Sequence, residues 1–127
     1  MAAENSITIN ISDFSISPGP RYYEQGDASG EIFYVQVLKK AFEDATTRHA
    51  KLVVVLDGVD GYASSFLDEA FGNLVYDFGA SKVRDALQLV SEEEPEWKDM
   101  IFNETVTNWE KRRKEHKSPK RTIPANS

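Results

Sequence analysis

Hydrophobic and polar residues alternate near the N-terminus of the chain. Ile7, Ile9 and Ile11 fall on one side of an extended chain, with Thr8 and Asn10 between them. A period of two is typical of a strand with one buried face. The pattern therefore predicts a half-buried edge strand at the start of the domain.

A second pattern predicts a central strand at residues 52–56. Its five residues, LVVVL, are all apolar and show no alternation. Such a run is typical of a strand that is covered on both faces, as in the middle of a parallel sheet. Residues 87–90 predict a further short strand, and residues 14–17 are a weaker candidate for another.

Two segments with apolar residues three and four positions apart predict amphipathic helices. The first spans residues 31–45, and Ser29 or Asp27 is available as its N-cap. The second continues to Gly79, a residue that can adopt the left-handed conformation at a helix end. Its stripe consists of Phe66, Leu67, Ala70, Phe71, Leu74 and Phe78.

A third helix is predicted to begin near Ser91. Ser91 and Glu94 match a capping box, and Pro95 is tolerated in a first helical turn. The resulting order of elements, with strands and helices alternating, predicts one α/β domain with a four- or five-stranded mixed sheet and helices packed on it. We expect this domain to cover residues 1–110.

Charge is divided unevenly along the chain. Residues 1–110 contain 8 Lys or Arg and 20 Asp or Glu, whereas residues 111–127 contain 7 and 1. We interpret residues 111–127 as a basic helix end followed by a flexible tail, and we expect no stable contacts beyond residue 117. The acidic body disfavours nucleic acid, so a role as a nucleic-acid accessory protein would depend on the basic tail alone.

The composition limits the cellular environment and the kinds of active-site chemistry that we expect for this protein. The chain contains no cysteine, so neither disulfides nor cysteine-ligated zinc can stabilise it, and we expect a reducing cytoplasm. Its longest apolar run is much shorter than the roughly 20 residues that span a bilayer. The two histidines, His49 and His116, lie in polar segments, and no serine-hydrolase or phosphate-binding motif is present. We predict no catalytic residue and no cofactor.

The loop at residues 19–30 is a candidate recognition element. It carries Arg21, Tyr22 and Tyr23 in a stretch rich in glycine and proline. Arg21 could bind a phosphate or carboxylate of a ligand, with the tyrosines packed against a partner. Alternatively, Arg21 pairs with a carboxylate of the body, and a tyrosine fills the edge of the core.

Acidic residues follow the predicted central strand. Asp57 and Asp60 lie at its carboxyl end, where open α/β sheets bind ligands, and together with Glu69 they could hold a divalent cation. Their spacing matches no metal-binding motif, so we predict no metal site. A small ligand- or metal-binding enzyme domain that uses this loop and Arg21 remains the alternative function.

Two serines, Ser64 and Ser65, precede the second predicted helix. Ser65 and Asp68 match the Ser-x-x-Asp pattern of a helix start, which predicts Ser65 as the N-cap. A phosphate on either serine would meet the free N–H groups and the positive dipole of a helix N-terminus. Both serines are therefore candidate phospho-acceptors, with Ser64 the freer one.

The segment VVVLDGVDGYASSFLDEAFGNL, residues 53–74, and the tripeptide of Gly19, Pro20 and Arg21 resemble the STAS-type domains of sulfate transporters and anti-sigma-factor antagonists. The similarity is closer to a bacterial STAS-like family without assigned function, and it covers about residues 7–109. In the antagonists, a serine of the strand-to-helix loop is phosphorylated by a partner kinase, and the resemblance places Ser64 and Ser65 there. Ala63 and Phe66 stand where that motif has Asp and Gly.

The resemblance implies a non-enzymatic regulatory module that docks on a protein partner, such as a kinase-like ATPase, through the strand-to-helix loop and the second helix. We expect no membrane partner. The residues expected to contact the partner are Arg21, Tyr22, Asp60, Tyr62, Asp68 and Glu69.

Overall fold

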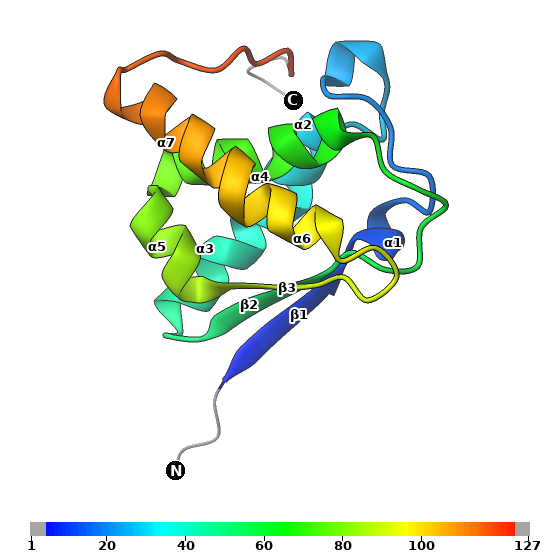
Figure 1. Ribbon diagram of the computed structural model, residues 1–127, viewed down its shortest axis with the longest axis horizontal. Coiled ribbons are helices and arrows are strands. Elements are labelled where there is room, and N and C mark those ends of the chain that lie inside the picture. The colour runs from blue at the N-terminus through cyan, green and yellow to red at the C-terminus, as the bar shows by residue number, and fades with distance from the viewer. Residues whose placement is uncertain (1–4, 124–127) are drawn as a thin grey trace.

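The computed structural model describes residues 5–123 and shows a small parallel sheet beneath a layer of helices (Figure 1). The strands β1 (Ser6–Asn10), β2 (Lys51–Val55) and β3 (Leu87–Val90) pair in the order β1-β2-β3, and both pairs are parallel. In the register, Val54 of β2 lies opposite Ile9 and Leu89. The edge, central and third strands predicted from the sequence are confirmed.

In the described part of the chain, the sheet has fewer strands than predicted, and helices cover one of its faces and not both. Within residues 5–123 it has three strands, so the prediction of a four- or five-stranded mixed sheet is wrong. The segment at residues 14–17 adds no strand, because β1 runs directly into a helical turn, α1 (Ile11–Phe14). Helices cover one face of the sheet (Figure 1), so Leu52 and Val54 of β2 are fully buried, whereas Val53 and Val55 on its other face are half-buried.

The first long helix forms as predicted and contains a π-helical turn. α2 (Gly30–Phe33), η2 (Tyr34–Leu38) and α3 (Lys39–Thr47) follow one another without a break, and η2 is the π-helical part. Ser29 is the N-cap, since its hydroxyl accepts a hydrogen bond of 3.1 Å from the N–H of Ile32. A short 3-10 helix, η1 (Tyr23–Gln25), interrupts the loop before it.

The second long helix, α4 (Ser64–Phe78), is the centre of the helical layer. It packs against α2 on one side and against the C-terminal helix on the other. Gly79 ends it with a positive φ of 92°, as its position predicted, and α5 (Ala80–Ala86) then leads into β3. The side chain of Trp109 lies directly on Gly72, where a Cβ atom would fall 2.1 Å from the indole Cε2.

The C-terminal helix begins later than predicted. It comprises α6 (Glu96–Met100), the π-helical η3 (Ile101–Thr105) and α7 (Val106–Lys114). The predicted capping box does not form, because the Ser91 hydroxyl donates to the carbonyl of Glu94 and the N–H groups that follow Ser91 are held by Asp57. No helix in the described part of the chain is long and apolar enough to span a membrane.

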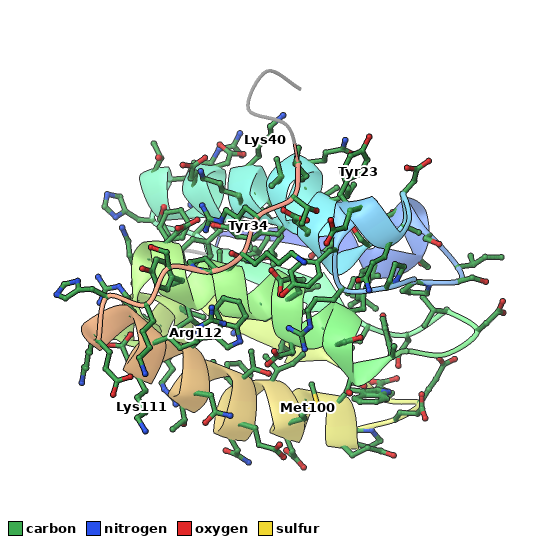
Figure 2. The ribbon with its side chains drawn as sticks, turned by 90° about the horizontal axis from the view of Figure 1, so that it is seen from above. Tyr23, Tyr34, Lys40, Met100, Lys111 and Arg112 are labelled. Atoms are coloured by element: carbon green, nitrogen blue, oxygen red, sulfur yellow. The ribbon has the colours of Figure 1, made fainter. Side chains whose placement is uncertain are left out.

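Residues 118–123 contradict the prediction that the chain makes no stable contacts beyond residue 117. After α7 the chain turns back and crosses the helical layer (Figures 1 and 2). Arg121 and Thr122 reach side chains of α4 and α2 along this path. The sequence did not predict these contacts, because they join segments that are far apart in the chain.

Candidate functional site

Hydrogen bonds join the loops at the carboxyl edge of the sheet. The Asp57 carboxylate, after β2, accepts from the N–H groups of Glu92 (3.0 Å) and Glu93 (2.9 Å), which follow β3. In return, the N–H of Gly58 donates to the Glu93 carboxylate at 3.0 Å. The loops after β2 and β3 therefore form one continuous surface.

The loop after α1 is tied to the same surface. The Ser17 hydroxyl donates to the Asp60 carboxylate at 2.7 Å, and the N–H of Asp60 donates to the carbonyl of Ile16 at 2.6 Å. Between these contacts the side chain of Ile16 is 61% exposed, the largest exposure among the bulky apolar residues of the described chain. An apolar side chain is thus presented to solvent by a hydrogen-bonded framework.

Tyr62 closes this surface at the side of α4. Its hydroxyl donates to the carbonyl of Leu56 at 2.6 Å, and its ring packs edge-on against Trp97 with 6.1 Å between the ring centroids. Burial raises the pKa of Tyr62 above that of a free tyrosine, and the charge of Asp57 raises it further. Tyr62 therefore remains a neutral, hydrogen-bonded anchor of the loop.

The carboxylates considered for a cation are not brought together. Asp57 and Asp60 bind different loops, as described above, and Glu69 binds Arg21 and Asn73. Residues 5–123 contain no group of three or more potential metal ligands. Arg21 is also engaged elsewhere, so the structure does not assemble the ligand site of the alternative function.

Arg21, Asp68 and Glu69 do come together. The Arg21 Nη1 donates to Asp68 Oδ2 at 2.9 Å and to Glu69 Oε1 at 3.0 Å. Burial alone would lower the pKa of Arg21, but its hydrogen bonds to the two carboxylates outweigh burial and raise it. The interpretation that Arg21 pairs with the body of the domain is confirmed.

Asp68 also holds the C-terminal helix. Its carboxylate accepts hydrogen bonds from the hydroxyl of Thr105 (3.1 Å) and the indole N–H of Trp109 (3.2 Å). Glu69 is only 1% exposed, and burial raises its pKa despite the hydrogen bonds from Asn73 and Arg21. We therefore omit Glu69 from any surface that touches a partner.

The prediction that Ser65 caps α4 is wrong. The N-cap is Ala63, whose side chain makes no capping hydrogen bond. Because the helix begins at Ser64, Ser65 lies inside the first turn rather than at the flanking position that a cap requires. Ser64 is exposed and Ser65 is half-buried, so Ser64 is the more accessible of the two candidate phospho-acceptors.

A second site was missed by the sequence interpretation. Glu31 and Asn73 are buried polar residues, 2% and 1% exposed, beneath the C-terminal segment. Asn73 lies within an apolar stretch of α4, a signal that could have marked it as a buried hydrogen-bonding residue. Glu31 gave no such signal, since acidic residues are common in a first helical turn.

Residues 29–97 match the STAS-like domain of unknown function (DUF4325). This segment is more than half of the chain, and the protein belongs to that family. It includes the central strand, α4 and β3, and it ends at the start of the C-terminal helix. No curated protein and no solved structure matches the chain.

Proposed function

We propose that this protein is a non-enzymatic regulatory module that docks on a protein partner. The docking surface consists of the loop between β2 and α4, the first turn of α4, and the loop after α1 that is hydrogen-bonded to Asp60. One observation carries the proposal: the three loops at the carboxyl edge of the sheet are joined by hydrogen bonds and present the exposed side chain of Ile16. A preorganised surface of this kind loses little conformational entropy on binding.

The charge of this surface indicates the kind of partner. Asp60 is exposed on it, as are the consecutive residues Glu92, Glu93 and Glu94 after β3. An acidic rim around an apolar side chain complements a partner that presents basic residues around an apolar pocket. The family resemblance suggests a kinase-like ATPase as the class of partner.

Ser64 provides a means of regulation. It is exposed in the first turn of α4, at the positive end of the helix dipole. A phosphate there would add about two negative charges to the docking surface and change its affinity for a basic partner. We keep Asp60, Tyr62 and Ser64 as the residues of this surface.

Co-purification with the tagged protein from its native host tests the proposal. Ile16→Asp should abolish recovery of the partner, because it places a charge where an apolar contact is needed. Asn108→Asp is the matched control, since it adds the same charge at an exposed position of α7. Docking through this surface would be contradicted if both variants failed to recover the same proteins, or if Ile16→Asp recovered everything that the wild-type protein recovers.

The recovered partner then tests the finer points. A purified kinase-like ATPase should bind the wild-type protein and transfer phosphate to Ser64. It should bind the Ser64→Asp variant more tightly, because the added negative charge faces a basic partner. Mass spectrometry of the protein after incubation with the partner and ATP identifies the modified serine. Phosphate on Ser65 but never on Ser64 would contradict the choice of Ser64.

A further inference from the structure

The last described residues of the chain lie against a buried carboxylate. The N–H and the hydroxyl of Thr122 donate to the two oxygens of Glu31, at 2.6 and 2.5 Å, and the N–H of Ile123 donates to it at 3.3 Å. One further hydrogen bond, of 3.0 Å, comes from the N–H of Tyr23. The C-terminal segment therefore supplies three of the four hydrogen bonds that residues 5–123 donate to Glu31.

Arg121 makes the adjoining contacts. We define the groove as the surface of α2 and α4 that residues 120–123 cover and that includes Glu31, Asn73 and Asp77. Its guanidinium donates to Asn73 Oδ1 at 3.0 Å through Nη2 and contacts both oxygens of Asp77, at 3.1 and 3.2 Å. The hydroxyl of Tyr34 also donates to Asp77, at 2.5 Å. Figure 2 shows the segment passing over Tyr34 between the helices. Asn73 and Asp77 thus form an acceptor pair that fits a guanidinium.

Two further contacts extend the groove. At one end, the ammonium of Lys120 pairs with Glu24 at 2.6 Å and lies 4.6 Å from the centre of the Tyr22 ring. At the other end, Ile123 forms a wall of a hollow of about 490 Å³, whose other lining residues are Tyr23, Ile32, Val35, Gln36 and Lys40. Residues 120–123 therefore meet a cation site, a guanidinium site, a hydroxyl site and a hollow of mixed apolar and polar lining in succession.

The acceptors and the donors of these contacts differ in their place in the chain and in their secondary structure. The acceptors Glu31, Asn73 and Asp77 lie within the segment that defines the family, on α2 and α4. The donors belong to residues 118–123, which form neither helix nor strand and follow the end of α7. Burial would raise the pKa of Glu31, but hydrogen bonds from Thr122, Tyr23 and Ile123 outweigh burial and lower it.

We propose that this groove is a peptide-recognition site and that the protein's own residues 120–123 occupy it as a built-in competitor. The external ligand is a segment of a partner protein with the order basic residue, arginine, threonine or serine, and aliphatic residue. Backbone N–H groups, one hydroxyl, one guanidinium and one ammonium make the polar contacts, and any segment of that order can supply them. This groove lies on α2 and α4, apart from the loops at the carboxyl edge of the sheet.

A built-in competitor sets the affinity that an external peptide needs. A segment tethered to the groove by a short linker has an effective concentration in the millimolar range, so a free peptide binds the intact protein weakly. Weakening the tethered segment should therefore increase the affinity of the same groove for a free peptide. A segment that only stabilises the fold would not give this result.

Peptide titration of full-length protein tests the proposal. The probe is a fluorescein-labelled peptide with the sequence of residues 118–127, SPKRTIPANS, and binding is measured by fluorescence anisotropy. The Arg121→Ala/Thr122→Ala double variant should bind the probe at least tenfold more tightly than wild type does. Adding Glu31→Gln to that variant should reverse the gain, and a probe with alanine in place of its arginine should bind neither protein.

A second measurement needs no variant. In the wild-type protein labelled with ¹⁵N, an excess of the unlabelled peptide should displace the tethered segment and move the amide signals of Thr122 and Ile123 to positions typical of a free chain. Circular dichroism establishes that the double variant is folded. The proposal is overturned if the folded variant shows no saturable binding, if Glu31→Gln leaves binding unchanged, or if the peptide leaves both amide signals in place.

Discussion

Gly72 provides a sharp test of how α4 packs against the C-terminal helix. A Cβ atom on Gly72 would lie 2.1 Å from Cε2, 2.4 Å from Cδ2 and 2.4 Å from Nε1 of Trp109. The indole cannot move away easily, because its N–H donates to Asp68 and the guanidinium of Arg112 lies over its ring at 4.3 Å. Gly72→Ala should therefore push α7 away from α4.

The expected loss of stability follows from two opposing effects. Replacing a helical glycine by alanine favours the helix by about 1 kcal/mol. Overpacking a core costs about 1–3 kcal/mol, and three overlapping ring atoms place Gly72→Ala near the upper end. The net loss is about 2 kcal/mol. With an m-value of about 2 kcal/mol/M for a domain of this size, the urea midpoint should fall by about 1 M.

Urea unfolding followed by tryptophan fluorescence measures this change, with Gly61→Ala as its control. A Cβ on Gly61 would meet no atom within 4 Å, so that variant should unfold near the wild-type midpoint. Adding Trp109→Phe to Gly72→Ala should recover part of the loss, since a smaller ring leaves room for the methyl group. A Gly72→Ala variant as stable as wild type would refute the packing argument.

Three further predictions use other residues. Ser29→Ala should cost about 1 kcal/mol of unfolding free energy in the same assay, because Ser29 caps α2, whereas Ser65→Ala should cost less than about 0.5 kcal/mol. In a spectrophotometric titration, Tyr34 and Tyr62 should ionise at higher pH than exposed tyrosines, since burial raises the pKa of both. Tyr34→Phe and Tyr62→Phe variants assign each ionisation step to its residue. The contacts of Glu31 lower its pKa, so they stabilise the fold above the ordinary carboxyl pKa and lose this effect as the pH falls through the lowered value. The free energy of unfolding should therefore decline less steeply between neutral pH and about pH 3 in the Glu31→Gln variant than in the wild-type protein.

Local patterns predicted the elements that depend on local causes. The apolar run at residues 52–56 identified the central strand between β1 and β3, although the run had predicted a strand covered on both faces and helices of the described chain cover one face. Ser29 and Gly79 marked one helix start and one helix end. By contrast, a boundary error of two residues placed Ser65 at the cap position instead of Ala63, because sequence patterns do not fix helix ends so closely.

Contacts between distant segments were the part that the sequence could not provide. Thr122 and Glu31 are 91 residues apart, and nothing in the basic C-terminal composition indicates that its donors meet a buried carboxylate. Arg21 and Asp68 are 47 residues apart, and the sequence left open whether Arg21 turned inward or outward. In both cases the outcome depends on how the helices pack, which periodicity alone does not specify.

The segment that carried the family resemblance, SFLDEAFGNL, faces inward in the folded protein. Its apolar residues fill the core, Asp68 and Glu69 hold Arg21, Gly72 admits Trp109, and Asn73 accepts from Arg121. These roles are architectural, since each fixes another element of the same chain. If the proposed function and groove are right, the residues that distinguish partners lie mainly outside this segment. They belong to the loops at the carboxyl edge of the sheet and, apart from Asn73, to the groove beneath residues 120–123, where substitutions can change binding without changing the fold.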